Sequence, residues 1–116
     1  MISQTLAQEV SQMEADLCSA FADPTRILIL YALDEKPCNV GELANELQIP
    51  QPSVSRHLKV LRDRGLVNGI RQGTNVQYHL VDKRLIQALD ILRSLMRDRI
   101  TYRANLIEKV ETWFVI

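Results

Sequence analysis

Apolar residues recur with helical spacing along the first twenty residues of the chain. They follow one another at intervals of four, three, four and four, as Leu6, Val10, Met13, Leu17 and Phe21. This period predicts a helix from about residue 4 to residue 21 with one apolar stripe. Asp23 followed by Pro24 then predicts the start of a second helix. Because residues 25–33 are apolar nearly all round, we expect that second helix at the centre of the core.

A short helix, a turn and a longer helix are predicted next. Asn39, with Glu42 three residues later, resembles a capping box that begins the short helix. Two prolines in the segment 49–52 form a tight turn. The longer helix is expected from about Gln51 to Arg64, ending at Gly65 in the left-handed conformation. Residues 40–64 therefore read as a helix-turn-helix.

After Gly65 the period of the pattern changes from helix to strand. Val76, Tyr78 and Leu80 alternate with polar residues, which is typical of a half-buried strand. We expect residues 66–71 as its partner and residues 72–75 as the connection, so that 66–80 form a β-hairpin. The predicted fold is mainly α with a β-hairpin (α+β), a winged helix-turn-helix in a single domain over residues 1–116.

A long last helix over residues 82–116 carries a second apolar stripe. Its first members are Leu85, Leu89, Leu92, Met96 and Ile100. The stripes of the first and last helices are too long for the thin core of one small domain to cover. We therefore expect residues 1–21 and 82–116 to form the interface of a homodimer.

The net charge of zero conceals a strong asymmetry along the chain. Residues 1–50 carry two basic against eight acidic side chains, and residues 51–103 carry eleven basic against four acidic ones. This asymmetry indicates that one surface meets a polyanion. The longest uncharged apolar run, residues 27–33, is far too short to cross a bilayer. With no export segment and two cysteines, we expect a cytoplasmic protein without a membrane partner.

The charge of the helix over 51–64 is concentrated on one face. Val54, Leu58 and Leu61 share the face that a core would cover, and the polar residues lie opposite. Arginine binds guanine edges, serine binds bases or phosphate, and lysine mostly binds phosphate. We expect DNA contacts, including the hairpin tip, from Gln51, Ser53, Ser55, Arg56, Lys59, Arg62, Arg71, Thr74 and Asn75. His57 falls near the core face, where a packing or capping role is expected.

Three segments together resemble the ArsR/SmtB family of winged-helix regulators. They are FADPTRILILYAL, NVGELANELQIPQPSVSRHLKVLRDRGLV and RQGTNVQYHL, and the resemblance covers roughly residues 18–81. It implies a homodimeric repressor that binds double-stranded DNA at an inverted-repeat operator and is released by an effector. Some family members carry a Cys-x-Cys pair where this chain has Asn39-Val40-Gly41, and others use histidines in the last helix, which has none here. A zinc or nickel site is therefore not expected, and no cofactor is required.

Two cysteines remain as candidate effector ligands. Cys18 and Cys38 are either buried, inert residues or the thiols of a sensor. As sensor thiols they would bind a thiophilic effector, a trivalent arsenical or another metalloid or heavy metal, that releases the repressor. Two thiols also suffice for a disulfide or a polysulfide bridge, and a redox or polysulfide sensor is the alternative. Because Cys38 lies near a helix N-terminus, we expect its pKa to be lowered and its thiolate to be reactive. A bridge would require the two residues to come together, either within one chain or between the two protomers of the dimer.

Two further function classes were weighed against DNA binding. No Ser-His-Asp spacing, phosphate-binding glycine loop or catalytic carboxylate pair occurs, so an enzyme is not expected. A winged helix that contacts only proteins is the other alternative, because the fold alone does not imply DNA binding. The basic face of residues 53–71 argues against it.

Overall fold

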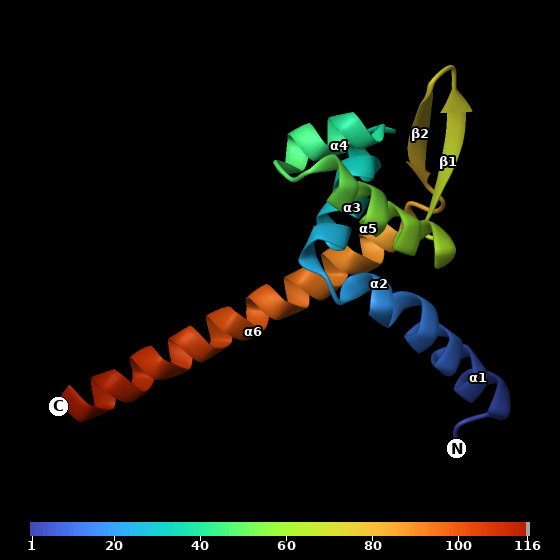
Figure 1. The fold of residues 1–116 in the computed structure, drawn as a ribbon. Coiled ribbons are helices and arrows are strands. Elements are labelled where there is room, and N and C mark those ends of the chain that lie inside the picture. The colour runs from blue at the N-terminus through green and yellow to red at the C-terminus, as the bar shows by residue number, and fades with distance from the viewer. Residues whose placement is uncertain (116) are drawn as a thin grey trace. The chain divides into compact units, whose positions relative to one another are not determined.

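The computed structural model describes the backbone of residues 1–115 and the side chains of residues 1–107. Two parts are described separately, residues 1–83 and the helix α6 (Arg84–Val115). The first part contains α1 (Gln4–Met13), the π-helical segment η1 (Glu14–Cys18), α2 (Ser19–Phe21), α3 (Pro24–Glu35), α4 (Val40–Leu47), α5 (Gln51–Asp63), β1 (Val67–Gln72) and β2 (Asn75–Leu80) (Figure 1). The predicted mainly α fold with a hairpin is confirmed. Expected apolar positions of α6 beyond residue 107 lie outside the described side chains.

The N-terminal helix spans the predicted residues but is not uniform. Ser3 begins it, since its hydroxyl accepts a hydrogen bond from the backbone N–H of Leu6 at 3.1 Å. The prediction of one regular α-helix over 4–21 is corrected by η1, where the wider π turn interrupts the apolar stripe. Leu6, Val10 and Met13 before it are exposed, whereas Leu17 within it is partly buried.

Helix α3 is central, but it is not buried all round. Asp23 caps it by accepting a hydrogen bond from the backbone N–H of Thr25 at 2.7 Å. Ile29, Leu30 and Leu33 are buried, because α2, α4, α5 and β2 all pack against this helix. The helix lies at the centre of the core as expected, although Leu28 on one side of it is 54% exposed.

Helices α4 and α5 begin as the sequence predicts. The capping box of α4 is complete, with Asn39 Oδ1 accepting from the N–H of Glu42 at 2.8 Å and Glu42 Oε1 accepting from the N–H of Asn39 at 3.1 Å. Helix α4 ends at Gln48 in the left-handed conformation. Pro52 lies in the first turn of α5, where its missing N–H has no intrahelical partner to lose.

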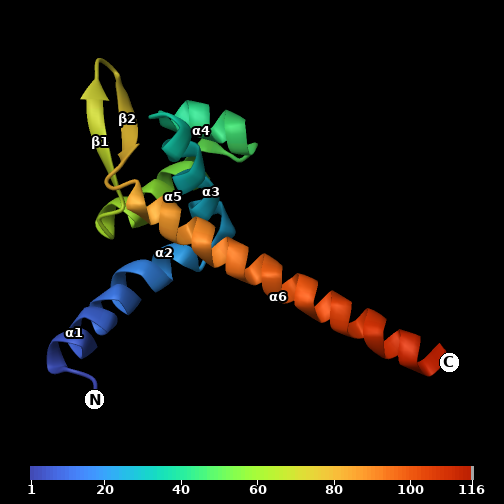
Figure 2. The same cartoon turned by 180° about the vertical axis from the view of Figure 1, so that it is seen from behind.

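The hairpin differs from the prediction at its turn. Gln72 pairs with Asn75 as the last rung of the ladder, so only residues 73–74 connect the strands, not 72–75. Gly73 has φ 63°, which glycine adopts without steric cost and which suits such a two-residue turn. The hairpin lies beside α3 and α5 in both views (Figures 1 and 2).

A third backbone segment that the sequence did not predict joins the hairpin. Cys38 pairs with Tyr78 of β2 through two backbone hydrogen bonds, of 3.2 Å and 2.8 Å. This pairing holds the loop between α3 and α4 against the strand. None of the described helices combines the length and the apolar content that a membrane span requires.

Candidate nucleic-acid interface

Helix α5 separates its apolar and polar residues onto opposite faces. Val54, Leu58 and Leu61 are buried in the core. The predicted contact residues on the other side are exposed, apart from the partly buried Ser53, and comprise Gln51, Ser55, Arg56, Lys59 and Arg62. The burial agrees with the face that the helical period assigned to the core. It leaves a polar surface along the full length of α5.

Arg56 is already held in position on this surface. Its guanidinium donates a hydrogen bond from Nη2 to Ser53 Oγ at 3.1 Å, one turn earlier on the helix. Both groups therefore belong to one small polar cluster at the start of α5. The remaining N–H groups of a guanidinium are free to bind a planar acceptor pair such as a guanine edge.

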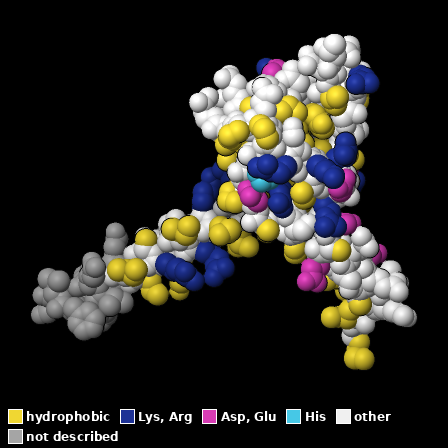
Figure 3. Space-filling view, viewed as in Figure 1, with side chains coloured by type: hydrophobic (Ala, Val, Ile, Leu, Met, Phe, Trp, Pro, Cys, Tyr) yellow, Lys and Arg dark blue, Asp and Glu magenta, His cyan; other side chains and the backbone are white. Residues whose placement is uncertain are grey.

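The hairpin tip supplies a second polar surface. Arg71, Thr74 and Asn75, which the sequence analysis expects to contact DNA, are all exposed, and Gln72 is exposed with them. Because β1 packs against α5, the tip and the helix belong to one body. Lysine and arginine side chains gather over the region of α5 in Figure 3. Such a surface suits a polyanion with a regular backbone.

His57 faces inward, as expected, and its partner is a residue that the sequence analysis missed. Arg26 of α3 donates a hydrogen bond from Nε to Nδ1 of the partly buried His57 at 3.3 Å. The same guanidinium donates from Nη1 to the backbone oxygen of Ser19. The sequence alone could have drawn attention to Arg26. It is one of only two basic residues among the first fifty, and it lies in an apolar segment.

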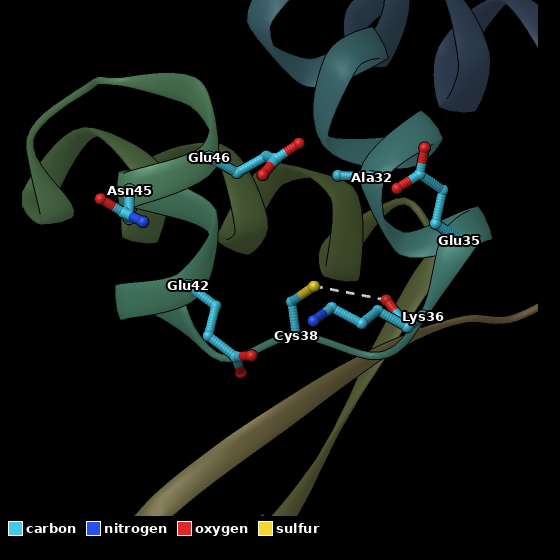
Figure 4. A pocket seen from close by; sticks show the side chains of 7 residues that line it. All are labelled: Ala32, Glu35, Lys36, Cys38, Glu42, Asn45 and Glu46. Atoms are coloured by element: carbon cyan, nitrogen blue, oxygen red, sulfur yellow. Dashed lines mark hydrogen bonds between the residues drawn. The ribbon is translucent and has the colours of Figure 1, made fainter.

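The two cysteines occupy different environments. Cys18, the last residue of η1, is exposed, whereas Cys38 is buried. The Cys38 thiol donates to the backbone oxygen of Lys36 at 3.3 Å and borders a cavity of about 190 Å³ that Glu42 also lines (Figure 4). Burial raises the pKa of Cys38, and the negative charge of Glu42 adds to this. The expected lowering of its pKa is therefore wrong, because burial and carboxylates outweigh the helix N-terminus.

The structure does not bring Cys18 and Cys38 together within one chain. Cys18 precedes the start of α3, and Cys38 follows its end. Twelve residues of α-helix span about 18 Å at 1.5 Å per residue, against the Cα separation of about 7 Å that a disulfide tolerates. Helix α1 extends away from the N-terminal end of α3, the end opposite Cys38 (Figures 1 and 2). Pairing between protomers stays a prediction.

Potential metal ligands are not clustered in the part of the chain whose side chains are described. Among the described residues, no group of three or more histidine, cysteine, aspartate or glutamate side chains is arranged to hold a metal ion. His57 is engaged by Arg26, and the Cys38 thiol lies inside the fold.

Comparison with known proteins places the chain among transcription regulators. Residues 23–69 match the family described as bacterial regulatory protein, arsR family. The HTH-type transcriptional repressor SmtB of Mycobacterium tuberculosis is 42% identical over 78 residues, which are 67% of this chain and 58% of the repressor. The chain thus matches little more than half the length of that curated relative.

Two solved structures are similar over a larger share of their length. NolR from Sinorhizobium fredii is 30% identical with a TM-score of 0.69, and the match covers 82% of this chain and 94% of that one. The cadmium metal-sensor CmtR from Mycobacterium tuberculosis is 45% identical with a TM-score of 0.57, covering 67% of this chain and 81% of that one. The chain belongs to the ArsR family of winged helix-turn-helix transcriptional regulators.

Proposed function

We propose that the protein is a homodimeric repressor that binds an inverted-repeat DNA operator. The observation that carries this proposal is the exposed polar face of α5, with Arg56 and Lys59 at its centre. In a helix-turn-helix, the second helix enters the major groove and its exposed side chains contact base edges. The exposed tip of the hairpin, with Arg71, would contact phosphate or the minor groove beside it.

Exposed apolar side chains on the terminal helices support the dimer. Six of them expose between 46% and 65% of their surface in the single chain: Leu6, Val10, Met13, Leu92, Met96 and Ile100. Exposed apolar side chains that recur along one face of a helix mark association sites. A two-fold arrangement would place two α5 helices about 34 Å apart, one turn of B-DNA, and so would select an inverted repeat.

We further propose that thiophilic agents release the repressor from DNA through its thiols. Cys18 is the accessible thiol of the chain's two cysteines, and a relative of this chain is described as a cadmium metal-sensor. Trivalent arsenicals, soft metals, oxidants and polysulfides all react with or bind such thiols. Because Cys38 lies about one helix length away, a chelate would use Cys18 residues of both protomers or thiols exchanged across the dimer.

Salt dependence of DNA binding tests the core of this proposal. A duplex selected from random sequences would be titrated at several salt concentrations by fluorescence anisotropy. If Lys59, Arg62 and Arg71 of both protomers contact phosphate, six contacts predict a slope of log K against log salt of about −5. A module that contacts only proteins would not bind any duplex in this way, and that result would overturn the proposal.

The thiol proposal is tested by replacing each cysteine separately. Cys18→Ser should bind DNA normally and fail to release it when a trivalent arsenical, a cadmium salt or a polysulfide is added. Cys38→Ser, the matched control in the same chain, should show whether the buried thiol is needed as well. The reagent that releases the parent protein identifies the class of effector. Normal release from both variants would show that the effector binds elsewhere.

A further inference from the structure

We infer that Arg26 is a positioning residue that links the N-terminal helix to the DNA-reading helix. Arg26 lies on α3, between Ser19 of α2 and His57 of α5. Its guanidinium therefore connects α2 to α5. The inference rests on the proposed function, since it concerns how the reading helix is held for DNA.

The geometry of Arg26 explains why it can hold two elements at once. Its partly buried guanidinium is planar and rigid, and it presents N–H groups along two edges. Nε donates to His57 Nδ1 at 3.3 Å, and Nη1 donates to the backbone oxygen of Ser19. The orientation of one planar group is therefore fixed by acceptors on both sides. A displacement of either acceptor must tilt the guanidinium or break a hydrogen bond.

On the side of α5, the contact point is well placed to control the reading surface. His57 adjoins Arg56, which lies on the exposed polar face, and precedes the buried Leu58. A rotation of α5 that moves His57 therefore also moves Arg56. The Asp23 carboxylate lies near this cluster: the hydrogen bond from the Thr25 backbone N–H is the main cause that lowers its pKa, and His57 and Arg26 lower it further.

On the side of α2, the contact point follows the irregular part of the N-terminal helix. Ser19 comes directly after η1, and π-helical turns are frequent at functional sites. The Ser19 hydroxyl is buried and has no hydrogen-bond partner among the described residues. The backbone oxygen that Arg26 binds is thus the polar group of Ser19 that connects α2 to α3. A change in the conformation of η1 would therefore displace the backbone oxygen of Ser19 and weaken its hydrogen bond with Arg26.

The experiment removes each half of the connection and measures DNA affinity, stability and salt dependence separately. Arg26→Gln should weaken binding to the selected duplex about 5- to 20-fold and leave the salt slope unchanged. His57→Leu should weaken binding to the same extent. His57→Asn should restore it to within about threefold, because Asn Oδ1 takes the place of the accepting Nδ1.

Combining the variants tests whether the two residues act as a unit. The double variant Arg26→Gln/His57→Leu should bind DNA no more weakly than either single variant, since both remove the same connection. Hydrogen–deuterium exchange of the full-length chain should become faster in both 14–21 and 51–63 when Arg26 is replaced. Faster exchange in only one of these segments would overturn the two-sided connection.

The alternative roles of Arg26 give different results. If Arg26 contacts phosphate, Arg26→Gln reduces the salt slope by about 1, and the inference is wrong. If the contact only stabilises the fold, DNA affinity follows the melting temperature across all the variants, His57→Asn included, and the inference is wrong. If Arg26→Gln does not fold, the His57→Asn and His57→Leu pair still decides the outcome. If the parent protein binds no duplex, the proposed function fails; normal binding by Arg26→Gln overturns only the inference.

Discussion

Replacing one apolar residue of α6 by a charged one should dissociate the dimer. Met96 lies in the middle of the exposed apolar stripe of α6 and exposes 62% of its surface in the single chain. In a two-fold interface the substitution Met96→Asp acts twice, once in each protomer. The matched control is Ser94→Asp, which adds the same charge at an exposed position roughly 160° around the same helix.

The size of the effect follows from the exposed fraction of Met96. Burying a large apolar side chain completely contributes about 1.5–3 kcal/mol, so the exposed part of Met96 would contribute about 1–2 kcal/mol in each protomer. The two copies together lose about 2–4 kcal/mol. Two carboxylates must also lose water if the interface still forms. Because 1.4 kcal/mol corresponds to a factor of ten, the lost burial alone should raise the dissociation constant about 30- to 700-fold, and the carboxylates should raise it further.

Sedimentation velocity across a wide concentration range measures this change directly. The parent protein and Ser94→Asp should sediment as dimers at micromolar concentration, whereas Met96→Asp should sediment as a monomer. The monomer reads only one half of an inverted repeat, so its affinity for the full operator should fall as well. A Met96→Asp protein that dimerises as tightly as the parent would refute the assignment of the α6 stripe to the interface.

Three further predictions concern the reading helix, the cap of α4 and the buried thiol. Arg56→Ala should cost about 1–3 kcal/mol of binding and relax the base preference at one operator position, whereas Lys59→Ala should weaken binding to all duplexes and reduce the salt slope by about 1; equal losses on selected and random DNA would contradict these roles. Asn39→Ala should lower the free energy of unfolding in urea by about 1 kcal/mol, because the cap loses its acceptor; an unchanged value would mean that the cap does not stabilise the fold. Glu42→Gln should lower the pKa of Cys38 without returning it to the ordinary value, because burial is the larger cause of the raised pKa. The pH dependence of alkylation, with Cys18 replaced by serine, measures this pKa, and a higher pKa in Glu42→Gln would refute the argument.

Features that depend on neighbouring residues were predictable from the sequence. The buried face of α5 follows from a period of 3.6 residues, and Leu58 and Leu61 lie where that period places them. The capping box of α4 involves Asn39 and Glu42, three residues apart, so its chemistry is visible in the chain itself. The left-handed conformation of Gly65, with φ 77°, is local in the same way.

Features that depend on packing between distant segments were not predictable. The hydrogen bond between Arg26 and His57 joins residues 31 positions apart, and it exists because α3 packs against α5. The burial of Cys38 depends on its pairing with Tyr78 in the hairpin. The sequence places a thiol near a helix N-terminus, but only the fold brings the surroundings that reverse the direction of its pKa shift.

The accessible thiol and the positioning arginine meet at neighbouring residues, which suggests how an effector acts without a bridge between Cys18 and Cys38. Cys18 directly precedes Ser19, whose backbone oxygen Arg26 binds. A group attached to the Cys18 thiol would disturb the end of η1 and displace Ser19. Through the hydrogen bonds of Arg26, this displacement would change the position of α5. Alkylation of Cys18 in a Cys38→Ser background should therefore weaken DNA binding when Arg26 is present and have little further effect in Arg26→Gln. Equal losses in both backgrounds, measured by anisotropy on the same duplex, would show that the thiol acts by another route.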